Sequence, residues 1–386
     1  MTRRLKIVIA PDKFKGSLTA SQAAQSVEAG FKTIFPSAEY VVLPVADGGE
    51  GTLEALVGAR RGSIEEASVS GPDGRPIAAA FGVLGDGETA VVELAKASGL
   101  ALVARGRNNP LTATTFGTGQ LIGAAIDGGA KRAIIAVGGS ATNDAGAGAL
   151  EALGAKFSDA GGRLLPRGGA ALATLQRIET EKLRERIEHV AIDIATDVNN
   201  PLCGPNGASA VYAPQKGADP EAVRLLDAAL AHFADVVAEL AGADLRDVPG
   251  TGAAGGFGFG FAALTGATLR GGAQLVLDLV GFDRHLNGAA LVVTGEGKLD
   301  SQTHSGKTPA AVAQAARKRD VRVVAVCGAL EISKGDLEIM GIEKAVAATP
   351  RGMPLETALV CAADLVRQAA AKLAEELPDL GRVVES

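Results

Sequence analysis

Seven short runs of apolar, largely β-branched residues recur along the chain and constrain its fold more than any other feature. They are Lys6–Ala10, Tyr40–Val45, Ala90–Leu94, Ala133–Val137, Ala290–Val293, Val321–Val326 and Ala345–Ala348. Several are continuously apolar, which is typical of strands that are covered on both faces of a parallel sheet. Helical patterns follow many of them: Ser17-Leu18-Thr19-Ala20 leads into one through Phe35, a second has Thr308 as N-cap and Pro309 as first helical residue, and a third covers Glu356–Glu376. This alternation predicts βα units in an α/β fold with a doubly wound sheet.

The middle of the chain differs from its two ends. Residues 63–90 carry turn signals such as Gly71-Pro72-Asp73-Gly74 and short alternating runs, which predict antiparallel strands. Residues 157–185 are polar, and residues 242–260 are rich in glycine. We therefore expect one α/β domain formed by residues 1–65 together with 286–386, and a second domain, residues 66–285, inserted between them.

Composition narrows the class of partner. The 386-residue chain has a net charge of −6 and 3% aromatic residues with no tryptophan, which argues against nucleic acid and anionic membranes. No window reaches the ~18 uncharged apolar residues of a membrane span, and no signal-peptide core precedes the first strand. Three cysteines far apart in the chain form no CxxC pair. These features predict a cytoplasmic enzyme that acts on small molecules.

Two strand ends near the N-terminus carry candidate functional groups. Asp12, Lys15 and Ser17 follow the first predicted strand, and Asp47 follows the second, just before Gly48-Gly49-Glu50. In an open α/β sheet, ligands bind beyond the carboxyl ends of the strands, so we expect the two strand ends to meet at one crevice. The alternative is that Asp12 and Ser17 only cap the turn and the helix that follow.

Two segments rich in Gly, Ser and Thr, Thr114–Gly119 and Gly138–Gly146, precede predicted helices. Backbone N–H groups in such segments suit phosphate or carboxylate oxygens, which makes Gly138, Gly139, Ser140 and Asn143 candidates for binding an anion. A structural turn is the alternative. Neither segment is a dinucleotide fingerprint or a nucleophile elbow, because Ile122 and Thr142 stand where those motifs require glycine.

Two further segments point to chemistry. Gly306-Lys307-Thr308 resembles the end of a P-loop, but Ser301 stands where that motif requires glycine. A helix that begins at Pro309 would still present N–H groups and Lys307 to an anion. Asp197, at the end of the apolar run Val190–Ile194, is a candidate general base, and the alternative is an Asx turn ahead of Pro201. The four histidines form no recognisable metal or triad motif.

Taken together, these segments closely resemble the type I glycerate kinase family of bacteria. The matching segments run in order through almost the whole chain: Ala10–Ser17, Pro44–Gly51, Thr114–Ile122, Gly138–Gly146, Ala195–Leu202, Gly207–Ala218, Pro249–Gly256, and Thr294–Thr303 with Gly306-Lys307. The resemblance implies phosphoryl transfer from ATP to D-glycerate with Mg²⁺, with 2-phosphoglycerate favoured over 3-phosphoglycerate as the product. It also implies a flavodoxin-like terminal domain, an inserted α/β domain related to restriction endonucleases, and an active site in the cleft between them.

Phosphoryl transfer needs donors and cations around the phosphates, oxygen ligands for Mg²⁺, and a base near the attacking hydroxyl. With the family in view, we expect the following roles: Asp197 and Lys15 catalytic; Asp12, Ser17, Asp47 and Lys216 for glycerate; Gly138, Gly139, Ser140, Asn143 and Lys307 for the phosphates of ATP; Glu296 and Asp300 for the metal. The chain departs from the family at Lys13, where serine is usual, and this lysine adds positive charge beside the crevice.

Two alternatives belong to other classes of protein. One is a nicotinamide-dependent hydroxy-acid oxidoreductase, which the missing GxGxxG fingerprint disfavours. The other is a non-catalytic, two-lobed ligand-binding protein, which normally requires an export signal.

Overall fold

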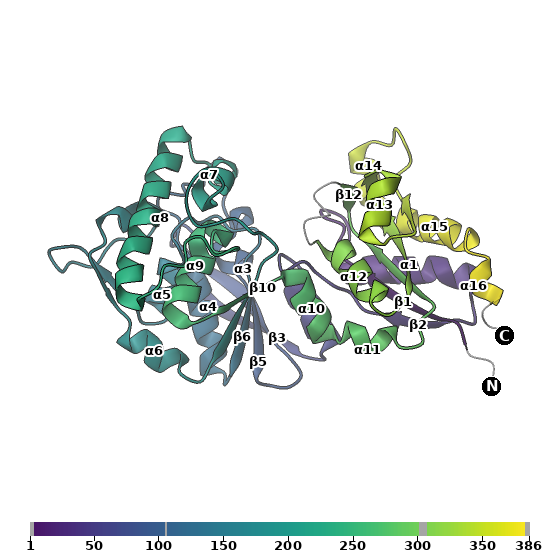
Figure 1. Ribbon diagram of the computed structural model, residues 1–386, viewed down its shortest axis with the longest axis horizontal. Helices are drawn as coiled ribbons and strands as arrows, with labels where there is room; N and C mark the ends of the chain where they lie inside the picture. The colour runs from purple at the N-terminus through teal and green to yellow at the C-terminus, as the bar shows by residue number, and fades with distance from the viewer. Residues whose placement is uncertain (1–3, 105, 301–306, 383–386) are drawn as a thin grey trace. The chain divides into compact units, whose positions relative to one another are not determined.

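The computed structural model describes residues 4–104, 106–300 and 307–382, and its chain divides into two compact units (Figure 1). The terminal unit combines both ends of the chain, Met1–Asp47 and Ala273–Ser386, and the inserted unit is Gly48–Gly272. Both units are α/β structures, as the sequence predicts. None of the described helices is long and apolar enough to cross a membrane.

The main sheet of the terminal unit has five strands, all parallel, in the order β2-β1-β11-β13-β15. Their bounds are β1 Lys6–Pro11, β2 Glu39–Val42, β11 Leu291–Gly295, β13 Arg322–Cys327 and β15 Lys344–Ala347, and a small parallel pair joins β12 Lys298–Asp300 to β14 Ala329–Glu331. Counted along the chain, the main sheet has the order 2-1-3-4-5, which is the order of flavodoxin-like folds. The strand order reverses between β1 and β11, so this sheet has its topological switch point there.

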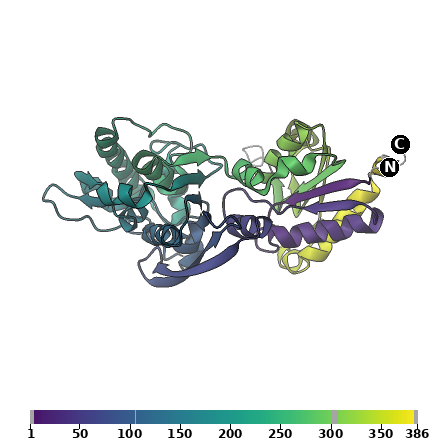
Figure 2. The ribbon, with the colours of Figure 1, turned by 90° about the horizontal axis from the view of Figure 1, so that it is seen from below.

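Helices cover both faces of this sheet (Figure 2). Their bounds are α1 Ala20–Ile34, α10 Gly272–Val280, α11 Phe282–Leu286, α12 Thr308–Arg317, α13 Lys334–Met340, α14 Leu355–Val360, α15 Ala362–Glu375 and α16 Asp379–Arg382. Helices α1 and α15 lie side by side; α1 contacts β1 and β2, and α15 contacts β13 and β15, while α12 lies on the opposite face. A Cβ atom at Gly30 would come within 2.4 Å of the Arg367 carbonyl oxygen, so only glycine allows α1 to approach α15 this closely.

Two helix boundaries in the terminal unit differ from the sequence prediction. The N-cap of α12 is Lys307 and Thr308 is already helical, because the Thr308 hydroxyl bonds to Asp12 instead of to its own helix. The expected helix Glu356–Glu376 is broken at Cys361 into α14 and α15. Helix α14 exposes Leu355 and Val360, whereas α15 buries its apolar face against α1, so the two segments pack differently.

The inserted unit has a six-stranded mixed sheet in the order β10-β9-β6-β5-β4-β3, in which β10, β9, β6 and β5 are parallel and β4 and β3 are antiparallel. The strand bounds are β3 Ser63–Ser70, β4 Pro76–Val83, β5 Thr89–Glu93, β6 Arg132–Ala136, β9 Ala191–Ala195 and β10 Thr268–Arg270, with a separate antiparallel pair of β7 Lys156–Ser158 and β8 Arg177–Glu179. The antiparallel strands predicted for residues 63–90 are thus confirmed.

The helices of the inserted unit enclose a core of their own, which includes Phe157, Phe233 and Phe259. Their bounds are α2 Thr52–Ala59, α3 Ala95–Ser98, α4 Phe116–Asp127, α5 Ala147–Ala152, α6 Glu181–Ile187, α7 Ala208–Tyr212, α8 Pro220–Ala241 and α9 Ala253–Thr265, with short 3₁₀ turns over Leu100–Leu102, Gly169–Thr174 and Pro214–Lys216. The relation of this unit to restriction endonucleases stays a prediction.

The boundaries of the compact units differ from those expected at residues 65/66 and 285/286. Helix α2 packs on β4 and β5, and a Cβ atom at Gly82 would lie 2.5 Å from Val57, so α2 belongs to the inserted unit. At the other crossing, α11 contacts α12 and therefore belongs to the terminal unit. These packing partners are distant in sequence, which is why a change in composition did not locate them.

Candidate active site

Asp12 lies at the switch point of the terminal unit, directly after β1. Its side chain is buried, its N–H donates to the Gly295 carbonyl (2.8 Å), and Oδ2 accepts a hydrogen bond from the Thr308 hydroxyl (2.6 Å). Asp12 therefore joins the end of β1 to the end of β11 and to the first residue of α12. Burial raises the pKa of Asp12 to about 6, and the nearby Asp47 carboxylate adds to this rise while the Lys13 ammonium opposes it.

Lys13 links the two acid-bearing strand ends of the terminal unit. Its ammonium nitrogen lies 3.9 Å from Asp12 Oδ1 and 3.8 Å from Asp47 Oδ1. Asp12 and Asp47 lie close together, because β1 and β2 are neighbours and one lysine reaches both carboxylates, and a shared ligand crevice stays a prediction. The sequence noted Lys13 only as added positive charge, and this bridging position depends on the register of the two strands.

Lys15 and Ser17 occupy the loop between β1 and α1. The Lys15 side chain is exposed, whereas the Ser17 hydroxyl donates to the Phe14 carbonyl (3.1 Å) and supports the turn. Ser17 does not cap α1: that role belongs to Thr19, which forms a capping box with Gln22. Lys15 is therefore placed to meet a ligand, while Ser17 already has a structural bond.

The metal candidates follow β11. Glu296 is buried, and Asp300 ends β12, where its carboxylate lies 3.8 Å from the ammonium of Lys307 and 3.9 Å from that of Lys298. Lys307 is the N-cap of α12 and makes no side-chain cap bond, so it stands beside the positive end of that helix. The motif residues Ser301–Thr303 and Gly306 lie outside the described residues.

Carboxylate oxygens of this kind suit Mg²⁺, which is usually held by one or two carboxylates together with water and substrate phosphates. Within residues 4–104, 106–300 and 307–382, no group of three or more His, Cys, Asp or Glu side chains is arranged to hold a metal ion. Glu296 and Asp300 offer oxygen donors of this kind, and the metal assignment stays a prediction.

In the inserted unit, the segment Gly138–Gly146 connects β6 to α5. Gly139 adopts a positive φ of 76° and is exposed, and Gly138 is half-buried, while Ser140 and Asn143 are buried. A Cβ atom at Gly138 would lie 2.8 Å from Gly49 Cα, so a side chain there would push away the turn that leads into α2. The glycines are thus the part of this segment that a ligand can approach.

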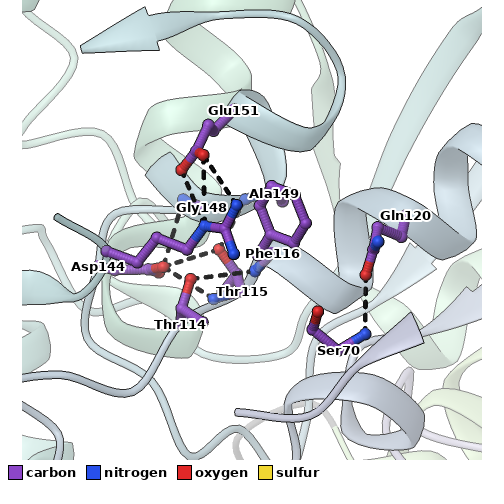
Figure 3. Close-up of polar contacts among 10 residues, drawn as sticks. Ser70, Thr114, Thr115, Phe116, Gln120, Asp144, Gly148, Ala149 and Glu151 are labelled. Carbon is purple, nitrogen blue, oxygen red and sulfur yellow. Dashed lines mark hydrogen bonds and ion pairs between the residues drawn. The ribbon is translucent and has the colours of Figure 1, made fainter. Parts of the chain in front are cut away.

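Asp144, which was not among the residues predicted from the sequence, joins the Thr114–Gly119 segment to the start of α5 through hydrogen bonds (Figure 3). Its buried Oδ2 accepts hydrogen bonds from the N–H (2.8 Å) and hydroxyl (2.9 Å) of Thr115, and from the Gly148 N–H (3.3 Å), while Oδ1 accepts one from the Gly146 N–H (3.2 Å). Burial raises the pKa of Asp144, and these hydrogen bonds oppose the rise. The carboxylate occupies the N-termini of α4 and α5, so the Thr114–Gly119 segment already holds an anion of the protein's own.

Lys216 is 2% exposed, although the sequence analysis expected it to contact glycerate or the transferred phosphoryl group. Its ammonium donates to the Thr142 carbonyl (2.6 Å). Burial lowers the pKa of Lys216 to about 7, and the negative charge of Asp144 acts in the opposite direction. Asn143 is also buried and donates from Nδ2 to the Ser209 hydroxyl (3.0 Å). Both side chains point to partners within the inserted unit.

Asp197 follows β9, next to the strand that leads into the Gly138 segment. It is half-buried, and its Oδ1 accepts a hydrogen bond from the Gly272 N–H (2.7 Å) at the start of α10. This hydrogen bond gives the Asp197 side chain a structural contact with the first residue of α10.

An open α/β sheet with carboxylates and lysines at its switch point is typical of enzymes that act on small, charged molecules. Comparison with known proteins makes the class precise. The chain belongs to the glycerate kinase family, whose model matches residues 7–377, and it is thus an ATP-dependent kinase, as the resemblance implied.

Individual relatives cover most of the chain. A glycerate kinase of Bacillus subtilis (strain 168) is 47% identical over 373 residues, which is 97% of this chain and 98% of that protein. A glycerate 2-kinase of Escherichia coli (strain K12) is 47% identical over 339 residues, 88% of this chain and 89% of that protein. A crystal structure of a candidate glycerate kinase 2 from Salmonella typhimurium LT2 superimposes with a TM-score of 0.88 at 43% identity, covering 98% of this chain and 100% of that one.

Proposed function

We propose that this protein transfers the γ-phosphoryl group of ATP to the C2 hydroxyl of D-glycerate, which gives 2-phosphoglycerate and ADP. The observation that carries the proposal is the family match over residues 7–377, together with 47% identity to a relative named glycerate 2-kinase. Transfer to the C3 hydroxyl is the competing outcome.

Asp197 is the proposed general base. One carboxylate oxygen takes the proton of the C2 hydroxyl as the oxygen–phosphorus bond forms and the bond between the γ-phosphorus and the bridging oxygen of ADP breaks. The Gly272 N–H bond to Oδ1 fixes the orientation of this carboxylate. The exposed ammonium of Lys15 supplies positive charge for the phosphoryl group or the glycerate carboxylate.

Two acids of the terminal unit, Asp12 and Asp47, bind glycerate in this proposal. Asp12 and Asp47 accept hydrogen bonds from its hydroxyl groups, and Lys13 holds the two carboxylates in place between them. Ser17 keeps the loop in shape through its bond to Phe14. The Asp12–Thr308 bond connects this glycerate region to the start of α12.

The phosphates of ATP are assigned to two places. The backbone N–H groups at Gly138–Gly139 and the following Ser140 suit phosphate oxygens, and so do Lys307 and the N-terminus of α12. Glu296 and Asp300 would hold Mg²⁺, which when bound neutralises phosphate charge and aligns the transferred group. Lys307, 3.8 Å from Asp300, places a second cation beside the same carboxylate.

A direct assay tests the proposal. ADP formation should require D-glycerate and Mg²⁺, and it should be much slower with L-glycerate or with glycolate, which lacks the C3 hydroxymethyl group. ADP released at the same rate without D-glycerate would show that water, not glycerate, accepts the phosphoryl group.

A further inference from the structure

Side chains from distant parts of the sequence form hydrogen bonds with the backbone carbonyls of the buried part of the Gly138–Gly146 segment. Asn108 Nδ2 donates both to the Ala141 carbonyl (3.0 Å) and to the Lys216 carbonyl (2.7 Å). Lys216 Nζ donates to the next carbonyl along the segment, that of Thr142 (2.6 Å). Two successive carbonyls of the segment are thus bonded to the turn that carries Lys216, either directly or through Asn108.

Glycines bring a second segment against the same stretch of backbone. Gly255 has a φ of 70°, and a Cβ atom there would lie 2.3 Å from the Thr142 carbonyl oxygen, while the Gly255 carbonyl accepts from the Ala145 N–H (3.0 Å). Ala145 itself has a positive φ of 53°, an unfavourable conformation that surrounding contacts must maintain. The segment is therefore fixed on several sides, which a simple surface turn does not require.

Lys216 and Asp144 are both buried ionisable side chains of the inserted unit. Burying ionisable groups is unfavourable, so their presence is weak evidence for stability alone. Among the described residues, Asp144 is the charged group that raises the pKa of Lys216 against the effect of burial. Asp144 also accepts hydrogen bonds from the N-termini of α4 and α5. The backbone that Lys216 contacts is therefore connected to both helices.

We infer that Lys216 and Asp144 are positioning residues: from inside the inserted unit they fix the backbone that presents Gly138 and Gly139 to the phosphates of ATP. The inference rests on the proposed function. Lys216 then touches neither glycerate nor the phosphoryl group and affects the reaction through the Thr142 carbonyl.

Chemical labelling of lysines tests burial without reference to activity. With an acetylating reagent at pH 8 and detection by mass spectrometry, Lys216 should react far more slowly than the exposed Lys15, with or without substrates. Because an accessible lysine with a pKa near 7 would be an unusually good nucleophile at this pH, slow labelling reports burial rather than protonation. Rapid labelling of Lys216 that D-glycerate suppresses would overturn the inference in favour of direct substrate contact.

Kinetics of the Lys216→Met variant test positioning. Methionine fills similar space but has neither charge nor donor, so the KM for ATP should rise roughly 10- to 100-fold, as small misplacements of binding groups do. The KM for D-glycerate should stay within about threefold of wild type, since displaced backbone at Gly138–Gly139 affects the phosphate contacts. The control is Lys156→Met, which removes an exposed lysine that pairs with Glu179 in the same unit and should change neither constant.

The double variant Lys216→Met with Asp144→Asn tests the two positioning residues together. Because asparagine replaces one accepting oxygen of Asp144 with a donor, the melting temperature should fall below that of Lys216→Met, and the KM for ATP should stay high because the Thr142 carbonyl still lacks its donor. A folded Lys216→Met protein with normal KM for ATP, or a double variant whose KM returns to normal, would contradict the inference. If wild-type protein shows no glycerate-dependent ADP formation, the proposed function fails while the labelling result still stands.

Discussion

Among single residues, Asp197 combines two roles that one substitution can separate. Its Oδ1 accepts the Gly272 N–H bond, which an asparagine oxygen can equally accept, whereas only a carboxylate can take a proton from a substrate hydroxyl. The local structure and the proposed chemistry therefore respond differently to the same change.

Asp197→Asn should lower kcat by roughly 10²- to 10⁴-fold, the usual contribution of a general base, with little change in melting temperature or in binding of either substrate. The control is Asp193→Asn on β9, the strand that precedes Asp197; this change breaks a partly buried ion pair with Arg132 and should reduce stability more than kcat. Steady-state kinetics with thermal melts measure both. A folded Asp197→Asn protein with near-normal kcat would remove Asp197 from the mechanism.

Lys15 differs from Asp197 because its side chain is exposed and its proposed role lies only in the reaction. Lys15→Ala should reduce kcat/KM roughly 10- to 100-fold, which corresponds to the loss of one hydrogen bond to a charged group. The melting temperature should stay unchanged because little packing is lost. Lys32→Ala, at an exposed site paired with Glu28, serves as the control. Equal kcat/KM for Lys15→Ala and Lys32→Ala would show that Lys15 is ordinary surface charge.

At the level of elements, the Asp12–Thr308 bond joins the end of β1 to the start of α12. Thr308→Val keeps the shape but removes the donor, so the free energy of unfolding should fall by about 1–3 kcal/mol at pH 8, where Asp12 is ionised. The loss should shrink at pH 5, because Asp12, with a pKa of about 6, is then largely protonated and its uncharged form depends less on the donor.

Urea unfolding at the two pH values measures this difference. Thr33→Val is a suitable control, since the Thr33 hydroxyl donates to the Gly30 carbonyl within α1 and has no carboxylate partner. The same loss at pH 8 and pH 5 in Thr308→Val would mean that the bond does not depend on the charge of Asp12.

The long buried elements could be predicted from the sequence, and the short ones could not. Each of the seven apolar runs contains residues of a strand, and in β1, β5, β6, β11 and β13 almost continuous burial leaves an apolar pattern in the sequence itself. The pairs β7–β8 and β12–β14 have three residues per strand and depend on distant partners, as does the helix break at Cys361. Short elements of this kind carry too few residues to show a period.

In the candidate site, too, some features could be predicted from the sequence and others depend on tertiary packing. The proximity of Asp12 and Asp47 follows from strand order, which the sequence predicts in outline. The inward direction of Asn143 and Lys216, and the occupation of the α4 N-terminus by Asp144, depend on tertiary packing. A glycine- and threonine-rich segment looks alike in sequence whether it receives a ligand or a carboxylate of its own chain.

For the whole molecule, the main consequence is that each unit has a separate core. A polypeptide of residues 48–272 should therefore fold alone and melt cooperatively. A polypeptide of residues 66–285, the bounds expected from the sequence, serves as the comparison. It lacks α2 and the start of β3, and with them the buried side chains of Leu53 and Leu56. At about 1.5–3 kcal/mol for each side chain, this loss should lower the melting temperature by at least roughly 6 °C. Equal melting temperatures would contradict the assignment of α2 to the inserted unit.

The central claim is phosphoryl transfer to the C2 hydroxyl of D-glycerate, and phosphorus NMR of the reaction mixture tests it most directly. With ATP, Mg²⁺ and D-glycerate, we expect ADP and one new phosphate ester. Its phosphorus resonance, recorded with coupling to protons, should be a doublet because C2 carries a single hydrogen. A triplet from the two hydrogens of C3 would contradict the position of transfer. Inorganic phosphate without any ester would contradict glycerate as the acceptor.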